Sequence, residues 1–124
     1  MTEAQQARDR QFAVELARIV ADDKCEDVTV MDLRGLSPVT DFFVICSGAS
    51  ERQMRSAAEH AIEYGRRVGE PPFTLSGLES ANWILIDFVN VVLHVFSPQY
   101  RTYYDLELLW GDAPRVEWQR SASA

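Results

Sequence analysis

One stretch decides the fold of this chain: Trp83-Ile84-Leu85-Ile86-Asp87-Phe88-Val89-Asn90-Val91-Val92-Leu93-His94-Val95-Phe96. It contains two near-continuous runs of β-forming residues, 83–88 and 91–96, on either side of Val89-Asn90. Such runs are typical of strands that are covered on both faces. The short spacer predicts a β-hairpin, although valine is a poor residue where a tight turn requires positive φ.

The hairpin divides its side chains between two faces of different polarity, because side chains alternate along a strand. A turn at Val89-Asn90 sets the pairs Asp87 with Val92, Leu85 with His94, and Trp83 with Phe96. We predict that the wholly apolar face is the core; it comprises Ile84, Ile86, Phe88, Val91, Leu93 and Val95. The other face carries every polar group of the two strands, and these groups need partners. It comprises Trp83, Leu85, Asp87, Val92, His94 and Phe96.

Asp87 and His94 are the ionisable residues of the second face. In this register they are diagonal neighbours within reach of each other. A catalytic dyad would also need a nucleophile or a substrate pocket, and the sequence places neither. We therefore predict that the two residues form a structural charge pair, which is compatible with a place in a binding face.

The segment after the hairpin predicts a helix. Ser97 followed by Pro98 is typical of an N-cap and a first helical residue, and the helix should end near Trp110, before Gly111 and Pro114. Aromatic residues gather around this helix and the hairpin, and we expect some in the core and some at a protein interface. They are Trp83, Tyr100, Tyr103, Tyr104 and Trp110.

The remaining periodicity predicts two more helices and three more strands. The helices are expected at 4–22 and 50–68, and the strands at 28–33, 40–47 and 73–76. The second helix begins with a capping-box pattern, in which a glutamine follows Ser50 by three residues. This order predicts an α/β fold with a mixed β-sheet flanked by helices, in which strands joined by short links are antiparallel.

The length of 124 residues supports a single domain, which we assign to residues 1–114, with residues 115–124 as a flexible C-terminal tail. No apolar run reaches the length of a membrane span, and the first residues lack the basic and apolar regions of a signal peptide. We therefore expect a cytoplasmic protein, or a protein of an organelle matrix if a longer precursor was trimmed, without a membrane partner.

The net charge of −7 limits the classes of partner. An acidic chain without a Lys/Arg cluster is poorly suited to bind the phosphate backbone, so little direct nucleic-acid binding is expected. The charge suits a basic protein better, and ribosomal proteins are basic. The alternative is that the charge only keeps the protein soluble.

The sequence predicts neither a metal site, a cofactor nor a catalytic centre. Cys25 and Cys46 have no metal-ligand spacing. The turn Ser47-Gly48-Ala49-Ser50 before a helix could hold a phosphate, but it lacks the lysine and the glycine spacing of a P-loop. The paired carboxylates of a nucleotidyltransferase are also missing. A nucleotide-binding or nucleotidyltransferase-like enzyme is therefore kept only as the alternative.

Several ordered motifs together resemble the ribosomal silencing factor (Iojap) family over roughly residues 12–114. They are Val28–Ser37, Thr40–Ile45, Gly48–Gln53, Trp83–Asp87, Val91–Phe96, and the positions Arg101, Tyr104, Leu106-Glu107 and Leu109-Trp110. The chain departs from the family at Val89-Asn90, where relatives commonly have Gly-Asp, and at Ser76, where a glutamate is usual.

The resemblance implies a fold similar to the nucleotidyltransferase core without the catalytic carboxylates. It also implies a non-enzymatic protein that binds the L-fourteen protein of the large ribosomal subunit, blocks joining of the small subunit and lowers translation when nutrients are short. Self-association is a further implication. By the matching motifs, the partner-binding residues would be Trp83, Asp87, His94, Phe96, Arg101, Tyr104, Leu106, Glu107, Leu109 and Trp110.

Overall fold

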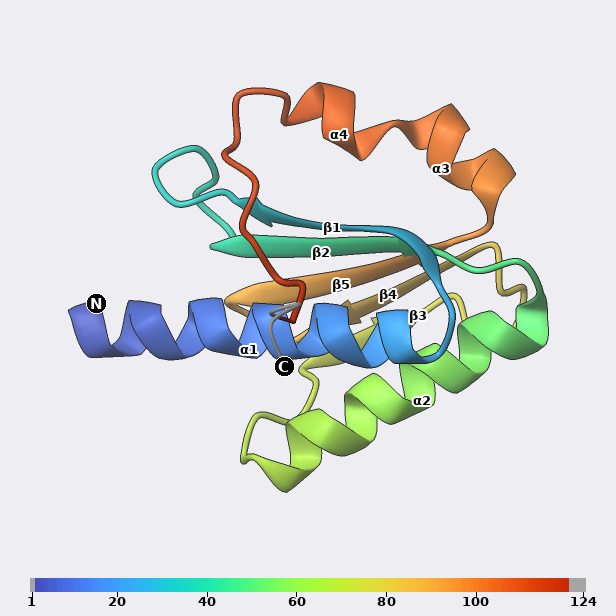
Figure 1. Ribbon diagram of the computed structural model, residues 1–124, viewed down its shortest axis with the longest axis horizontal. Helices are drawn as coiled ribbons and strands as arrows, with labels where there is room; N and C mark the ends of the chain where they lie inside the picture. The colour runs from blue at the N-terminus through green and yellow to red at the C-terminus, as the bar shows by residue number, and fades with distance from the viewer. Residues whose placement is uncertain (1, 121–124) are drawn as a thin grey trace.

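A five-stranded mixed sheet with the strand order β1-β2-β5-β4-β3 forms the centre of the computed structural model, which describes residues 2–120 (Figure 1). The strands are β1 (Glu26–Asp32), β2 (Phe42–Ser47), β3 (Thr74–Ser76), β4 (Trp83–Asp87) and β5 (Val91–Phe96). The helices are α1 (Glu3–Asp22), α2 (Glu51–Arg67), α3 (Pro98–Tyr104) and α4 (Leu106–Leu109). α1 and α2 lie on one side of the sheet, whereas α3 and α4 lie on the other (Figure 1).

The predicted pairing of the hairpin is confirmed. Trp83 pairs with Phe96, Leu85 with His94, and Asp87 with Val92 across antiparallel β4 and β5. The other strands joined by short links, β1 with β2 and β3 with β4, are also antiparallel, whereas β2 and β5 are parallel. α2 leads from β2 to the edge strand β3, and the chain then returns through β4 to β5, which lies next to β2. The fold is therefore the expected mixed sheet flanked by helices.

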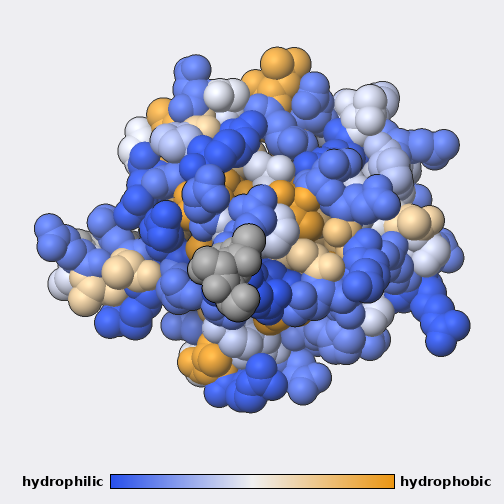
Figure 2. Space-filling model, in the orientation of Figure 1, coloured by the Kyte–Doolittle hydropathy of each residue, from blue (hydrophilic) through white to orange (hydrophobic). Residues whose placement is uncertain are grey.

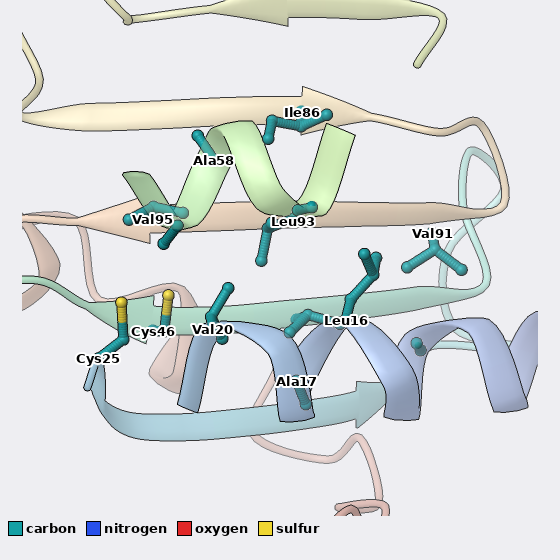
Figure 3. Packing of buried hydrophobic residues seen from close by; sticks show 14 of the residues in the cluster. Leu16, Ala17, Val20, Cys25, Cys46, Ala58, Ile86, Val91, Leu93 and Val95 are labelled. Atoms are coloured by element: carbon teal, nitrogen blue, oxygen red, sulfur yellow. The ribbon is translucent and has the colours of Figure 1, made fainter. Parts of the chain in front are cut away.

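The predicted core face of the hairpin is confirmed as well. Ile84, Ile86 and Leu93 have no exposed surface and belong to the main apolar cluster. Figure 3 shows Ile86 and Leu93 between the sheet and the helices α1 and α2. α2 can lie close to the sheet because small residues face it. A Cβ on Gly65, for example, would collide with the Glu70 carbonyl and the Phe88 ring. Burial of this continuous apolar surface is the main source of stability.

The hairpin turn holds valine in a backbone conformation that β-branched residues rarely adopt. Val89 has φ of 80°, and the Asn90 N–H donates to the Phe88 carbonyl at 3.2 Å, which closes a γ-turn. The Asp87 carboxylate accepts the Val89 N–H at 2.7 Å. The valine is thus held at positive φ by hydrogen bonds on both sides, although its side chain disfavours that region.

The helix predicted from Pro98 to Trp110 is interrupted at Asp105. Ser97 caps α3 as expected, and its hydroxyl accepts the Tyr100 N–H at 3.4 Å. Asp105 then adopts a left-handed conformation with φ of 44°, and its carboxylate accepts the Leu108 N–H at 3.3 Å. Asp105 therefore ends α3 and caps α4, so that two short helices replace the predicted one. Aspartate tolerates this conformation better than most residues.

The segment after α4 corrects the expectation of a flexible tail for residues 115–118. The Val116 N–H donates to the Val30 carbonyl at 2.9 Å, and the Trp118 indole donates to the Val28 carbonyl at 3.1 Å. Val116 is buried. An edge strand has unpaired backbone groups, and here the C-terminal segment satisfies those of β1. Residues 121–124 lie outside the described residues.

In the part of the chain that the structure describes, no helix combines the length and apolar character needed to cross a membrane. Among the same residues, no group of three or more His, Cys, Asp or Glu side chains is arranged to hold a metal ion.

Candidate partner-binding surface

α3 and α4 cover part of the second face of the sheet and bury a smaller apolar cluster there. Its fully buried members are Met31, Leu33, Ile45, Phe96 and Ala113. Phe43, Trp83, Leu106 and Trp110 pack against this cluster and are partly buried. Of the predicted partner-binding residues, Phe96 is therefore buried in this cluster. Trp83, Leu106 and Trp110 pack against the cluster beneath the outer surface of α3 and α4.

Trp83 forms the centre of an aromatic stack that links the sheet to α3. Its ring lies 4.9 Å from the ring centroid of Phe96 and 4.7 Å from that of Tyr104. Tyr104 in turn contacts Tyr100 and Tyr103. The stack passes from the buried Phe96 to three exposed tyrosines, so Trp83 has a packing role and also lies at the border of the exposed surface.

His94 is buried beneath this stack and is neutral. Its Nδ1 accepts a 3.0 Å hydrogen bond from the Trp83 indole N–H, which leaves the ring proton on Nε2. The Nε2 atom has no hydrogen-bond partner among the described residues. Burial among aromatic rings, including Phe43 at 4.5 Å, lowers the pKa of His94 to about 3. A neutral histidine orients Trp83 instead of contributing a charge.

The predicted charge pair between Asp87 and His94 is wrong. The Asp87 carboxylate is used within the hairpin turn, where it accepts the Val89 N–H. His94 is directed to Trp83. The physical reason is that the strained turn needs a nearby hydrogen-bond acceptor, which Asp87 provides. A protonated His94 in its apolar surroundings would lower the stability of the fold.

Arg101 and Glu107 connect the two short helices to each other and to the sheet. The Arg101 guanidinium donates to both carboxylate oxygens of Glu107, from Nε at 2.9 Å and from Nη2 at 3.2 Å. Its Nη1 donates to the Ser47 hydroxyl at the end of β2 at 2.9 Å. The Arg101 side chain is only 11% exposed. We call these three residues the Arg101 clamp.

Exposed apolar side chains line the outer side of α3 and α4. They form what we call the apolar ridge: Tyr100, Tyr103, Tyr104, Leu108 and Leu109. Tyr103, Leu108 and Leu109 are 80%, 77% and 71% exposed. Figure 2 shows hydrophobic atoms over the region of α4, at the top of the view, among mostly hydrophilic neighbours. An exposed apolar patch of this kind is typical of a protein–protein contact.

The sequence does not single out Leu108 as a binding residue, and it does not divide Tyr100 and Tyr103 between core and surface. A single helix through residue 110 does not predict that Leu108 and Leu109 both face outward beside Tyr103. The signal that could have found this arrangement is Asp105, because aspartate followed by a short apolar run is an N-cap pattern.

The surroundings of the apolar ridge are acidic. Residues 98–114 contain one base, Arg101, and three acids: Asp105, Glu107 and Asp112. Beside the ridge lies a polar cleft of about 620 Å³, which is also lined by Asp27. Because Arg101 is already paired with Glu107, the remaining charge of this region is negative. Such a surface favours a partner with basic side chains.

The turn that could have held a phosphate uses its backbone N–H groups within the protein. The Gly48 N–H donates to the Phe96 carbonyl at 2.9 Å, and the Ala49 N–H donates to the Gln53 side chain. A Cβ on Gly48 would collide with the side chain of Met54. The glycine therefore permits close packing of α2, and the turn serves as an ordinary capped helix start with Ser50 as the cap.

Comparison with known sequences gives one consistent result. The family model described as "Ribosomal silencing factor during starvation" matches residues 5–124. Ribosomal silencing factors from Halalkalibacterium halodurans and Bacillus subtilis are 45% and 39% identical to the chain. The alignments cover 79% and 84% of this chain, and 84% and 89% of the relatives. The chloroplastic protein Iojap of Zea mays is 37% identical over 86% of this chain, which corresponds to 46% of the maize protein.

Two solved structures have the same fold. A crystal structure of a protein from Bacillus halodurans superposes with a TM-score of 0.74 and 41% identity, covering 86% of this chain and 98% of that one. A protein from Chromobacterium violaceum superposes with a TM-score of 0.77 and 30% identity, covering 91% and 94% of the two chains. Sequence and structure therefore lead to the same group of relatives.

Proposed function

The chain belongs to the ribosomal silencing factor (Iojap) family, and from this premise we propose that it binds the L-fourteen protein of the large ribosomal subunit. Bound there, it blocks joining of the small subunit by steric exclusion and represses translation under nutrient limitation. The protein acts in the cytoplasm, without catalysis and without a cofactor.

The apolar ridge in its acidic surroundings is the observation that carries this proposal. A ridge of exposed tyrosines and leucines supplies the apolar centre of an interface, and Tyr is enriched among residues that dominate binding energy. The flanking carboxylates of Asp105 and Asp112 complement the positive charge of a ribosomal protein. A protein that binds through such a surface can exclude another subunit sterically, without a catalytic site.

The predicted partner-binding residues divide into two groups under this proposal. Tyr104 and Leu109 contact the partner together with Tyr103 and Leu108, whose side chains are exposed in the same ridge. Apart from Asp87, which acts within the hairpin turn, the remaining predicted residues hold the ridge in place from the sheet or from the inner sides of the helices. They are Trp83, His94, Phe96, Arg101, Leu106, Glu107 and Trp110.

Co-sedimentation with purified large and small ribosomal subunits tests the proposal. We expect the chain to migrate with large subunits and to reduce their joining with small ones. Leu109→Asp should abolish both effects because it places a charge within the apolar ridge. Val68→Asp is the matched control, since Val68 is an exposed apolar residue at the end of α2, on the opposite side of the sheet. Migration with small subunits alone would refute the proposal.

Calorimetric titration with nucleotides and magnesium separates the proposal from the enzymatic alternative. A binding protein that works by steric exclusion should give no heat of binding, because the Gly48 and Ala49 N–H groups are already used. Self-association is a separate expectation from the family resemblance, and analytical ultracentrifugation of the free chain measures it.

A further inference from the structure

The Arg101 clamp joins two consecutive short helices to a strand that is distant from them in the sequence. Arg101 lies on α3, Glu107 on α4, and Ser47 at the end of β2. Each of the three guanidinium nitrogens donates one hydrogen bond, and all acceptors belong to this chain. The bidentate geometry fixes the relative orientation of the two side chains as well as their distance.

α4 depends on such external contacts because it is only four residues long. A single turn of helix is unstable alone, since nucleation costs more than one turn of hydrogen bonds returns. Leu106 and Trp110, one turn apart, face the second apolar cluster and anchor the inner side. Leu108 and Leu109 then face the solvent. They do so only as long as α4 is held in this orientation about its own axis relative to α3.

We propose that Arg101 and Glu107 are positioning residues of the docking surface, which set α4 so that Leu108 and Leu109 join the tyrosines of α3 in one apolar ridge. The inference rests on the proposed function and assigns separate roles within its surface. Leu108, Leu109 and Tyr103 contact the partner, and the Arg101 clamp acts through them.

Burial and charge both oppose a direct role for the ion pair in the contact. The Arg101 side chain is only 11% exposed, and a carboxylate of the partner would have to compete with Glu107 and Ser47, which already accept hydrogen bonds from its three nitrogens. Both oxygens of Glu107 already accept hydrogen bonds from Arg101, and the Glu107 side chain is 30% exposed. An arginine that contacted a basic partner directly would moreover repel it, because the two carry the same charge.

A charge exchange within the pair distinguishes positioning from contact. Arg101→Glu and Glu107→Arg should each weaken affinity for purified large ribosomal subunits by at least about tenfold, because each leaves two like charges facing each other. The double variant Arg101→Glu/Glu107→Arg restores opposite charges, and the Ser47 hydroxyl can donate to the new carboxylate. Its affinity should return to within about threefold of the parent.

The exposed ion pair between Arg67 and Glu63 on α2 provides the matched control. Glu63→Arg makes the same change of charge away from the ridge and should leave affinity unchanged. Circular dichroism and urea melting verify that each variant is folded. Should the single exchanges fail to fold, Glu107→Gln and Arg101→Lys replace them, since both keep the size of the side chain but lose the bidentate pair.

A second measurement follows α4 in the free protein. In Glu107→Gln, hydrogen exchange at the Leu109 and Trp110 amides, which donate to the Asp105 and Leu106 carbonyls, should be faster than in the parent. Unchanged exchange at these amides would overturn the inference.

The binding outcomes separate the inference from the function on which it rests. If the parent does not bind large subunits, the proposed function fails and the positioning role fails with it. If the parent binds but the double variant stays as weak as the single ones, only the inference fails, because the two residues then contact the partner directly.

Discussion

The two faces of the sheet differ in how completely helices cover them. α1 and α2, with 20 and 17 residues, seal one face, and Ile84, Ile86 and Leu93 are fully buried there. On the other face α3 and α4 have only 7 and 4 residues and leave large apolar side chains exposed. The same hairpin contributes side chains to both faces. Its side chains on the first face stabilise the core, and those on the second face support the short helices that carry the proposed binding surface.

The difference also appears in the polar groups. The core side of the hairpin is wholly apolar, whereas the second side contains His94, whose Nδ1 orients Trp83. His94 thus combines one ring nitrogen that orients Trp83 with a second, Nε2, that has no partner among the described residues and costs stability. Four measurements test how far the two faces have separate roles.

Leu93→Ala should give the largest effect. Leu93 has no exposed surface and lies in the centre of the sealed face, so its truncation should cost about 2–5 kcal/mol of unfolding free energy. Urea denaturation measures this cost. Affinity of the folded fraction for large subunits should stay unchanged, and Val39→Ala, at a largely exposed site, should alter stability by less than about 0.5 kcal/mol. A small loss for Leu93→Ala would contradict the assignment of this face as the core.

Acidification should destabilise the protein through the second face. Unfolded histidine has a pKa near 6.5, and burial lowers the pKa of His94 in the folded protein to about 3. Between these values the unfolded chain binds more protons. Stability from this group is therefore complete above pH 6.5 and falls as the pH decreases toward 3. The contribution of His94, measured by urea melts as the difference between the parent and His94→Phe, should fall by about 2 kcal/mol between pH 7 and pH 5. In His94→Phe this part of the slope should disappear; a persistent slope would assign it to other groups.

Trp83→Phe should cost about 1–2 kcal/mol of stability, because it removes the indole N–H and leaves Nδ1 of His94 without its donor. We expect this loss of stability to be smaller than that for a fully buried group left without a hydrogen-bond partner, because Trp83 is only partly buried. In a His94→Phe background the same substitution should cost clearly less. Equal costs in both backgrounds, measured by a double-mutant cycle, would show that the hydrogen bond has no energetic role.

Val89→Gly should give the smallest change and should stabilise the protein by about 1 kcal/mol. Relief of strain at φ of 80° outweighs the added entropy of the unfolded glycine. Thermal melting detects the shift. Asp105→Gly is the contrasting variant, since aspartate tolerates its φ of 44° and also accepts the Leu108 N–H, so it should not stabilise. Destabilisation by Val89→Gly would mean that the valine side chain contributes packing that exceeds the strain.

Much of the fold could be predicted because local pattern and tertiary structure agree. The turn at Val89-Asn90 fixed which residues pair across the hairpin, and alternation then identified the core face correctly. The Ser50 cap is a local signal that needs only the next three residues, and it was found where predicted. Such features depend on neighbours in the chain, so a single sequence contains them.

By itself, then, the sequence determined the five strands and the two long helices, the hairpin register, the core face and the resemblance that placed the chain in its family. Tertiary structure alone decided that Asp87 caps the turn while His94 holds Trp83, because burial and competing partners select among possible hydrogen bonds. It also decided the outward direction of Leu108. The physical reason is that a four-residue helix takes its orientation from the Arg101 clamp and the apolar cluster beneath it, which join residues distant in the chain.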